Sequence, residues 1–388
     1  MKITGISLKN WRNFKEAAFS IGDQIYIVGP NASGKSNLLD VFRFLHDISK
    51  EGGGLYSAIE SRGGISKIRC LSARQYPEIE ITVTLTDTSN NAQWVYSIGI
   101  GQEVRGYRKP KILHEFVSKD GKRLFSRPDK KDVDDPERLY QTFLEQINEN
   151  AKFRDISRTF QAIRYLHLVP QVVRYPQYFS ERKMPEDPYG QNFLELLAKT
   201  PERTRIARLT KILNILKVAV PNITNLTLHP DNFGHPHLQA IYSHWRPGAG
   251  KQNEDQFSDG TLRIIGMLWA LLETKDNMLL LEEPELSLHP GIVKQLPDLM
   301  KKINKDLKTK IQSQILISTH SYELLSDKSI SGDQVLMLLP DKEGTQIKTA
   351  SGIKEVRDLL LAGMSVGDVV LPKVTPKDLF QKSLGEYI

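Results

Sequence analysis

The segment from Gly29 to Ser36 carries the residues best suited to hold phosphate. It reads Gly-Pro-Asn-Ala-Ser-Gly-Lys-Ser and fits the pattern G-x-x-x-x-G-K-[ST] at every constrained position. An apolar run at 24–28 precedes it, and apolar residues at helical spacing follow it. In such a strand–loop–helix turn, backbone N–H groups and the helix start point at phosphate oxygens. The sequence therefore predicts a nucleoside triphosphate site rather than a glycine-rich turn that matches by chance.

Two side chains of this segment have separate expected roles. Lys35 would reach the β- and γ-phosphates, and the Ser36 hydroxyl would bind Mg²⁺. A guanine-reading motif is incomplete at 304–307, where Leu stands in place of the required Asp, so ATP is expected rather than GTP. The residues expected at the nucleotide are Gly29, Asn31, Ala32, Ser33, Gly34, Lys35, Ser36 and Asn37.

An acidic cluster follows a second apolar run, at 277–281. The cluster reads Glu282-Glu283-Pro284-Glu285, and in a P-loop enzyme such a strand end supplies the second Mg²⁺ contact and the hydrolytic base. Glu282 stands at the metal-facing position, which usually holds Asp, so its extra methylene leaves the exact metal geometry open. Glu283 would polarise the attacking water. Alone, this segment could be an ordinary acidic turn, but beside a P-loop it predicts hydrolysis.

Two weaker segments lie on either side of this cluster. Ser258, Asp259 and Gly260 open an apolar helix, whose start is either an anion site without a lysine or a simple N-cap. His320 ends an apolar strand, at the edge where ligands bind in open α/β sheets. A lone histidine at a strand end is more often structural. These segments occur in a fixed order: the loop, the serine–glycine helix, the acidic strand and the strand that ends in histidine. Their order makes one pattern out of four separate signals.

In this order the segments resemble the ABC-type ATPase heads of the SMC, RecF and OLD families. Residues 6–14, ISLKNWRNF, also resemble the first strand and turn of RecF-like heads, which implies that Arg12 lies near the nucleotide. The segment 288–290 is closer to OLD-like predicted ATPases than to transporters. The resemblance covers about residues 1–70 and 222–330. The matching residues are Lys35 and Ser36 for Walker A, Ser258 to Gly260 for the signature, Glu282 and Glu283 for Walker B, and His320 for the switch histidine.

The resemblance implies a site shared between two protomers. ATP and Mg²⁺ at the P-loop of one protomer would be covered by Ser258 and the amides at Gly260 of another, in an ATP-dependent homodimer. His320 would sense the γ-phosphate, and hydrolysis would loosen the dimer. The best-placed candidate for the Q-loop residue is Gln75.

The elements that position these residues are expected to form an α/β fold, a P-loop ABC-type head with two lobes. A chain of 388 residues exceeds one typical core. We expect residues 1–85 to form an N-terminal lobe with the P-loop, and 223–388 a C-terminal lobe with the signature, Walker B and switch histidine. Between them, 86–222 is expected to be an inserted, mostly helical lobe with a β-hairpin near 94–125. Its apolar spacing is too short for a coiled-coil arm.

Composition points to a cytoplasmic protein that has no membrane partner. No run of about 18 apolar residues occurs, and the N-terminus enters a strand pattern rather than a signal peptide. The single cysteine, Cys70, excludes an internal disulfide framework and a cysteine-based zinc hook. Only 68 residues follow His320, and they contain no Asp-x-Asp, so we expect the TOPRIM nuclease of many OLD-like proteins to be absent.

The positive charge of the chain is concentrated in one segment. Residues 105–131 contain ten basic and three acidic side chains, a local charge of +7 that equals the net charge of the whole chain. The aromatic residues Tyr107, Phe116 and Phe125 are interleaved with them. This composition fits a surface that tracks a nucleic-acid backbone. A solvated basic hairpin and a docking face for an acidic protein remain open as alternatives.

The sequence thus favours an ATPase switch that controls a separately encoded effector protein, in the setting of bacterial anti-phage defence. DNA would be bound through residues 105–131. One alternative is a DNA-clamping ATPase of RecF/SMC type in DNA repair or chromosome maintenance. Another is an ATPase that regulates a toxin or nuclease without contacting DNA.

Overall fold

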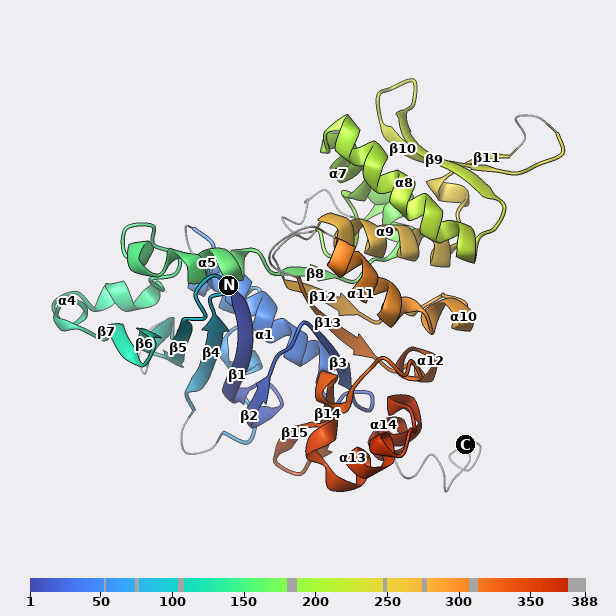
Figure 1. Ribbon diagram of the computed structural model, residues 1–388. Coiled ribbons are helices and arrows are strands. Elements are labelled where there is room, and N and C mark those ends of the chain that lie inside the picture. Colours follow the sequence, from blue (N-terminus) through green and yellow to red (C-terminus); the bar gives the residue numbers. More distant parts are fainter. Residues whose placement is uncertain are drawn as a thin grey trace, which may run out of the picture.

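Two six-stranded sheets organise the chain, and the helix that follows the P-loop lies between them (Figure 1). The computed structural model describes residues 1–51, 54–73, 77–103, 108–179, 187–246, 250–273, 278–306 and 313–375. Within these residues, no helix is long and apolar enough to cross a membrane.

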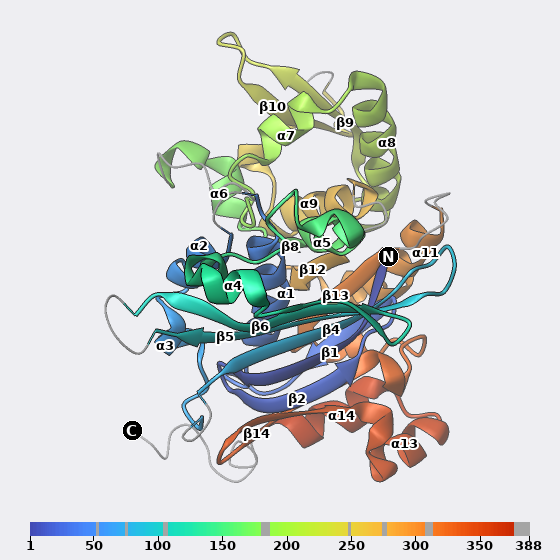
Figure 2. The ribbon, with the colours of Figure 1, turned by 90° about the vertical axis from the view of Figure 1, so that its left-hand side faces the viewer.

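The first sheet is antiparallel and has the order β2-β1-β4-β5-β6-β7. Along β4, buried and half-buried residues alternate, as expected of a strand with one face on a core. Figure 2 shows the long strands of this sheet side by side below α1. Its strands are β1 (Lys2–Trp11), β2 (Phe14–Ser20), β4 (Ile79–Thr86), β5 (Gln93–Gln102), β6 (Pro110–Lys119) and β7 (Lys122–Arg127).

The second sheet, the core sheet, has the order β15-β14-β3-β13-β12-β8 and is parallel except for β15. All residues of β3 and β13 are buried, because helices or the first sheet cover both faces. Its strands are β3 (Gln24–Val28), β8 (Arg164–Leu166), β12 (Met278–Glu282), β13 (Gln314–Thr319), β14 (Val335–Asp341) and β15 (Gly344–Thr349).

Alternate side chains of the core sheet enter two separate hydrophobic cores. Leu280 and Leu316 pack with α1 and the first sheet. Leu279 and Ile317 pack with the helix α9 on the opposite face. The period of two along each strand therefore places α1 and α9 on opposite faces of the same sheet.

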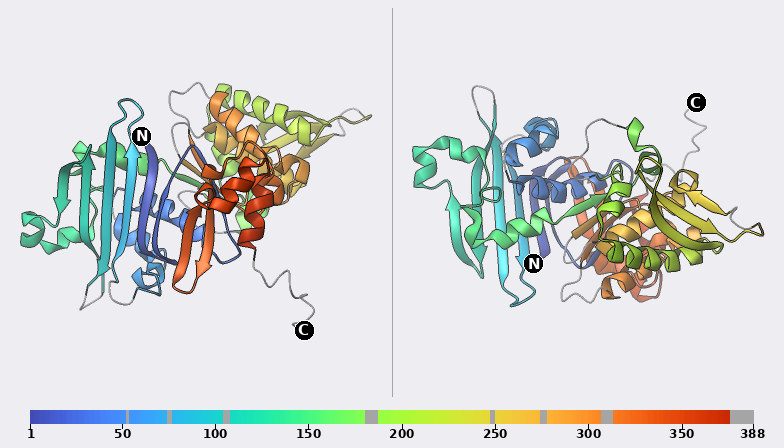
Figure 3. Two further views of the ribbon diagram at one scale, coloured as in Figure 1. Left: turned by 60° about the horizontal axis from the view of Figure 1, so that its bottom comes forward. Right: turned by 90° about the horizontal axis from the view of Figure 1, so that it is seen from above.

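The remaining elements surround this centre. The three-stranded sheet β11-β10-β9 and helix α8 form the end of the upper lobe, while α13 and α14 lie beside β14 (Figures 1 and 3). The helices are α1 (Lys35–Ile48), α2 (Gly54–Glu60), α3 (Ile65–Ile68), α4 (Lys130–Asp134), α5 (Arg154–Gln161), α6 (Pro170–Arg174), α7 (Phe193–Lys199), α8 (Glu202–Ala219), α9 (Asp259–Glu273), α10 (Pro290–Val293), α11 (Leu296–Asp306), α12 (Tyr322–Leu325), α13 (Lys354–Leu361) and α14 (Val366–Val374), and the upper strands are β9 (Ile223–Pro230), β10 (Pro236–Tyr242) and β11 (Lys251–Asn253).

The expected boundary at residue 86 does not separate two units. β4 pairs with β5 from Ile79 opposite Ile100 to Thr86 opposite Gln93, so the hairpin that follows β4 extends the first sheet. β8 then joins the core sheet, and α6, α7 and α8 contribute side chains to the core that contains α9. The hairpin expected near 94–125 is present as β5 and β6, but both strands extend the first sheet. Helical apolar spacing begins only at residue 139. Residues 86–222 therefore do not form a separate, mostly helical lobe.

Candidate nucleotide-binding site

Three strand ends of the core sheet bring the predicted motifs together. In the pairing of β12 with β13, Glu282 lies opposite Ser318, and in the pairing of β13 with β3, Thr319 lies opposite Val28. The residues that follow these strands therefore meet at one edge of the sheet. They are the P-loop, the acidic cluster and His320, and parallel α/β sheets bind ligands at this edge.

The P-loop depends on two glycines. Gly34 has φ +100°, and a Cβ there would lie 2.2 Å from the side-chain amide nitrogen of Asn13. A Cβ on Gly29 would lie 2.5 Å from the Ser33 hydroxyl oxygen. Any larger residue at either position would displace the loop. Ala32 also has a positive φ, of 62°, which completes the curl expected of this segment.

Asn13 supports the loop from outside. Its Nδ2 donates to the Ser33 carbonyl at 2.7 Å and to Thr345 Oγ1 at 2.8 Å, and its Oδ1 accepts from Asn37 Nδ2 at 2.8 Å. The loop is thus tied to the β1–β2 turn, to β15 and to α1. Sequence analysis missed Asn13, although it belongs to the segment that gave the resemblance to RecF-like heads.

Lys35 lies over the loop. Its Nζ donates to the carbonyls of Gly29 and Pro30, both at 3.1 Å. Burial lowers the pKa of Lys35, while Glu283, Glu282 and Glu285 oppose that shift. The ammonium therefore satisfies its donors with loop carbonyls, at the place where phosphate oxygens would accept them.

Glu282 extends from β12 to the start of α1. The Ser36 hydroxyl donates to one of its carboxylate oxygens, and the Tyr165 hydroxyl donates to the other. A serine hydroxyl and a carboxylate are the oxygen donors that Mg²⁺ prefers, so these residues fit the ion. Among the residues that the structure describes, no cluster of three or more His, Cys, Asp or Glu could hold a metal. A Mg²⁺ ion here would therefore be shared with the phosphates.

Glu283 and His320 form the second half of the site. Glu283 has φ +45°, which costs a non-glycine residue roughly 1–2 kcal/mol, and its N–H donates to the Ser318 carbonyl at 3.0 Å. Its Oε1 lies 3.7 Å from His320 Nε2. Burial and the nearby Lys35 lower the pKa of His320, and Glu283 opposes them. The structure thus brings the proposed base and the proposed γ-phosphate sensor side by side.

Glu285 is a site residue to which the sequence assigned no role. Its Oε1 accepts from Thr319 Oγ1 at 2.5 Å and from the His320 backbone N–H at 3.2 Å. Burial raises the pKa of Glu285, and its Oε2 has no partner among the described residues. This carboxyl group fixes the turn that carries His320. Its only sequence signal was its place at the end of the acidic cluster.

The signature residues lie at the start of α9. Ser258 caps the helix, because its Oγ accepts from the Thr261 N–H at 3.2 Å and lies 2.8 Å from Thr261 Oγ1. Asp259 forms an ion pair with Arg174 at 2.7 Å. A Cβ on Gly260 would lie 2.5 Å from the Ser287 carbonyl, so this glycine allows α9 to contact the segment after the acidic cluster.

Arg12 is bound to α1. Its Nη2 lies 2.6 Å from Asp40, which also pairs with Arg62 at 2.9 Å. Burial alone would raise the pKa of Asp40, but Arg62 and Arg12 lower it. The guanidinium of Arg12 is therefore engaged one helical turn beyond the P-loop, and direct nucleotide contact by Arg12 stays a prediction. Gln75, the Q-loop candidate, lies outside the described residues.

The basic segment 105–131 divides into buried and exposed parts, and Arg105 and Tyr107 fall outside the described residues. Arg127 is fully buried between Glu115 at 3.1 Å and Asp132 at 3.0 Å. The Phe125 ring packs 4.8 Å from that of Phe153. One of the expected stacking residues thus serves the core. The cations that remain exposed are Arg108, Lys109, Lys122, Arg123, Lys130 and Lys131.

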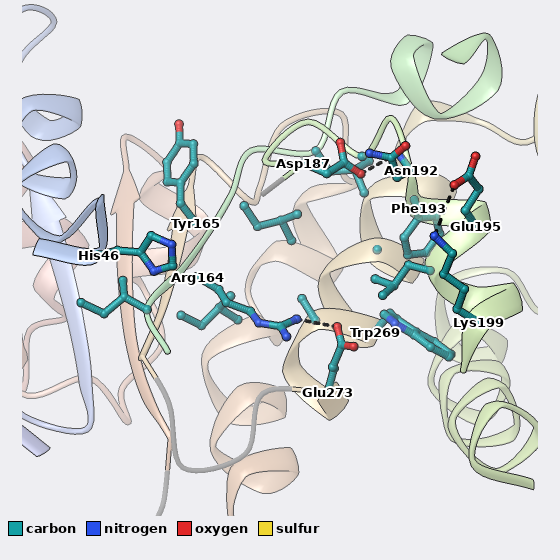
Figure 4. A pocket seen from close by; sticks show the side chains of 18 of the residues that line it. His46, Arg164, Tyr165, Asp187, Asn192, Phe193, Glu195, Lys199, Trp269 and Glu273 are labelled. Atoms are coloured by element: carbon teal, nitrogen blue, oxygen red, sulfur yellow. Dashed lines mark hydrogen bonds and ion pairs between the residues drawn. The ribbon is translucent and has the colours of Figure 1, made fainter. Parts of the chain in front are cut away.

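A cavity of about 590 Å³ lies behind the site, between β8, α7 and α9 (Figure 4). Its wall includes Arg164, which pairs with Glu273 at 2.8 Å, and the buried Trp269. No residue of the P-loop and none of Glu282, Glu283 and His320 lines it. In Figure 4, the hydroxyl of Tyr165 points away from the Arg164–Glu273 pair, which agrees with its contact to Glu282.

Comparison with known proteins identifies the family and the fold of the chain. Residues 25–326 match a family described as "AAA domain, putative AbiEii toxin, Type IV TA system". A stretch of 46 residues is 52% identical to the DNA replication and repair protein RecF of Chlamydia caviae, and the match spans 12% of each protein.

Several solved structures with a similar fold are SMC heads. One, bound to the C-winged helix domain of ScpA, has a TM-score of 0.55 at 14% identity and covers 90% of this chain and 98% of its own. The Smc head domain with an extended coiled coil from Pyrococcus furiosus, bound to the C-terminal domain of ScpA, has a TM-score of 0.52 at 13% identity and covers 93% and 99%. The expected fold of an ABC-type ATPase head in the SMC/RecF-like group is thereby confirmed.

Proposed function

Because the chain belongs to the family of AAA domains described as a putative AbiEii toxin of type IV toxin–antitoxin systems, we propose that it is an ATP-driven switch that controls a separately encoded effector protein. As an ATPase of the SMC/RecF-like type, it has a nucleotide as its ligand. The observation that carries the proposal is the contact between Ser36 and Glu282, with Glu283 and His320 beside it.

Each residue of the site has a separate role in the proposed reaction. Lys35 exchanges its two loop carbonyls for phosphate oxygens when ATP binds. Mg²⁺ held by Ser36 and Glu282 would neutralise charge on the phosphates. Glu283 accepts a proton from the attacking water. Burial and Lys35 lower the pKa of His320, which favours the neutral ring, and a neutral ring can donate one hydrogen bond toward the γ-phosphate.

The proposed switch is a homodimer closed by two nucleotides. Two observations support it: α1 and α9 lie on opposite faces of the core sheet, and the start of α9 contacts the segment after the acidic cluster. The N–H groups at the start of α9 form an anion site that a second protomer can offer to the γ-phosphate. Hydrolysis then removes the charge that joins the two protomers.

The test uses Glu283→Gln, which preserves shape and hydrogen bonding but cannot act as a base. We expect turnover to fall by about 10²-fold or more while ATP is retained. Analytical ultracentrifugation should then show a dimer with ATP and a monomer without it. Lys35→Ala in the same background is the control and should stay monomeric. A variant that binds ATP and remains monomeric would contradict the dimer.

A second candidate function is DNA clamping in repair or chromosome maintenance. It is favoured by the short match to a protein named for DNA replication and repair, and by the exposed cations around β6 and β7. An ATP-trapped Glu283→Gln protein would shift duplex DNA in a gel, and the shift would weaken steeply with salt. If no shift is seen at low salt, DNA clamping is excluded, and the switch that regulates a protein remains as the function.

The effector and the setting in anti-phage defence are part of the proposal. Purification of the ATP-trapped protein from its native host, beside Lys35→Ala as the nucleotide-free control, should enrich one partner only in the trapped form. Equal recovery of that partner with both forms would separate partner binding from the nucleotide and contradict the switch.

A further inference from the structure

We propose that Tyr165 is the positioning residue for Glu282, the carboxylate expected to contact Mg²⁺. The inference rests on the proposed ATP hydrolysis at this edge of the sheet. It adds a residue from β8, a strand outside the four motifs. Its role is to fix a glutamate where related sites more often use the shorter aspartate.

The two oxygens of Glu282 have different partners. One accepts from Ser36 on α1, and the other accepts from the Tyr165 hydroxyl. Hydrogen bonds from a hydroxyl to a carboxylate are among the stronger ones in proteins. With both oxygens held, the plane of the carboxylate is set before a metal arrives.

The sheet register explains why Tyr165 reaches this group. In the parallel pairing of β8 with β12, Tyr165 lies opposite Leu280, two residues before Glu282. Because side chains alternate along strands, Leu280 and Glu282 share a face with Tyr165. That face is directed toward α1, since Leu280 and Tyr165 pack against the core that contains α1.

Two further contacts hold the pair in place. The guanidinium of Arg43, on α1, lies 4.3 Å from the centre of the Tyr165 ring. His167 Nδ1, two residues along the chain from Tyr165, lies 3.3 Å from the carbonyl oxygen of Glu282. Tyr165 of β8 thus contacts the side chain of Glu282, His167 just after β8 contacts its backbone, and Arg43 of α1 contacts the tyrosine ring.

A glutamate needs this support more than an aspartate does. It has one more rotatable bond, and ordering a glutamate side chain costs up to about 2 kcal/mol of conformational entropy. Partners outside the coordination sphere that orient a metal-binding side chain commonly change metal affinity by about 10- to 100-fold. Tyr165 supplies such a partner.

The test measures the Mg²⁺ dependence of nucleotide binding in Tyr165→Phe, with a fluorescent ATP analogue. In EDTA, we expect the affinity of Tyr165→Phe for the ATP analogue to match that of the wild type. The Mg²⁺ concentration that gives half of the Mg²⁺-dependent increase in this affinity should rise about tenfold. Tyr140→Phe is the matched control, because it also removes a tyrosine–carboxylate hydrogen bond, to Glu103, away from the site. It should leave the Mg²⁺ dependence unchanged.

A double-mutant cycle with Glu282→Asp separates positioning from a structural role. The shorter side chain cannot reach Tyr165, so Tyr165→Phe should have little further effect on Mg²⁺ dependence in that background. Equal effects in both backgrounds, or a lowered melting temperature with unchanged Mg²⁺ dependence, would overturn the inference.

If Tyr165→Phe does not fold, Arg43→Met keeps the hydroxyl and should raise the Mg²⁺ requirement less. A wild type without Mg²⁺-dependent ATP binding would instead overturn the proposed function.

Discussion

At the scale of single residues, the side chains of the site hold one another in place. Lys35 donates to its own loop, Ser36 to Glu282, and Glu283 lies near His320. Each side chain lies close to the position in which it would bind phosphate, metal or water. Its present contacts can be replaced by that ligand. Such preorganisation reduces the cost of ordering the site when the ligand arrives.

Lys35→Ala is the sharpest residue-scale prediction. Removing the ammonium takes away the charge that faces the β- and γ-phosphates, so ATP affinity should fall by about tenfold or more. Isothermal titration calorimetry measures the change. Lys15→Ala removes a lysine from an exposed ion pair with Glu343 and is the matched control. Equal affinity in Lys35→Ala and Lys15→Ala would mean that the P-loop assignment is wrong.

The motifs could be read from the sequence because local constraints produced them. Glycines at 29 and 34 are required by close approach and by positive φ, and the carboxylates follow a continuous apolar strand. Tyr165 could not be found in this way. It lies in a strand of three residues, and only the pairing of β8 with β12 brings it to Glu282.

At the scale of elements, the largest error of sequence analysis concerned β5, β6 and β7. The sequence predicts a hairpin near 94–125 within an inserted, mostly helical lobe, but these strands extend the first sheet. Part of that charge is internal: Arg127 is enclosed with Glu115 and Asp132 at the end of β7. Pairing of charges among β6, β7 and α4 leaves no periodic signal in the sequence, so charge counting alone places such residues on the surface.

The ion pair between Arg127 and Asp132 predicts a pH dependence of stability. Burial alone would raise the pKa of Asp132, but hydrogen bonds from Arg127 and from the Asp129 N–H lower it to about 2. Because the pKa of Asp132 is lower in the folded state than in the unfolded state, its ionised form stabilises the fold. This contribution is fully present above the pKa of the unfolded state, about 3.9, and is lost as the pH falls toward 2.

Asp132→Asn tests this element. At pH 7 it leaves Arg127 with one buried carboxylate fewer and should cost about 3–5 kcal/mol of unfolding free energy. Comparison with the wild type in denaturant titrations should show this difference shrinking between pH 4 and pH 2, because the wild type loses the same contribution. A difference that stays constant over that interval would contradict the assignment. Asp134→Asn, at the end of the same short helix, is the control.

At the scale of the whole molecule, the strands of the core sheet contribute side chains to two hydrophobic cores. The signature helix α9 belongs to one core and the P-loop helix α1 to the other. The fold of SMC heads could be expected from the order of the four motifs. Whether two copies complete each other's site is a property of the pair of molecules and needs a test with two different variants.

The prediction mixes Ser258→Arg with Lys35→Ala. Each variant alone should be inactive, the first because a bulky cation occupies the place of the phosphate, the second because ATP is not bound. A head-to-tail dimer of the two joins the intact P-loop of one to the intact serine of the other. Coupled-enzyme measurement of phosphate release should therefore show partial recovery of turnover in the mixture.

Two controls support this experiment. Thr210→Arg places the same cation on the exposed face of α8 and should leave turnover unchanged. Circular dichroism should show both inactive variants folded. A folded mixture as inactive as its components means that Ser258 does not act across the dimer or that both sites must fire together. An ATP-trapped Glu283→Gln protein that stays monomeric in sedimentation would then contradict the dimer itself.

The helix α1 connects chemistry at one end to protein contacts at the other. Its 14 residues span about 21 Å, from Lys35 to the turn where Ile48 accepts from Thr142 Oγ1 at 3.0 Å. Its buried apolar side chains pack in a single core, between the two six-stranded sheets. Any protein that binds near residues 142–161 and displaces the far end of α1 must change the affinity for ATP. By reciprocity, ATP must change the affinity for that protein by the same factor, so α1 would couple the two binding events in both directions.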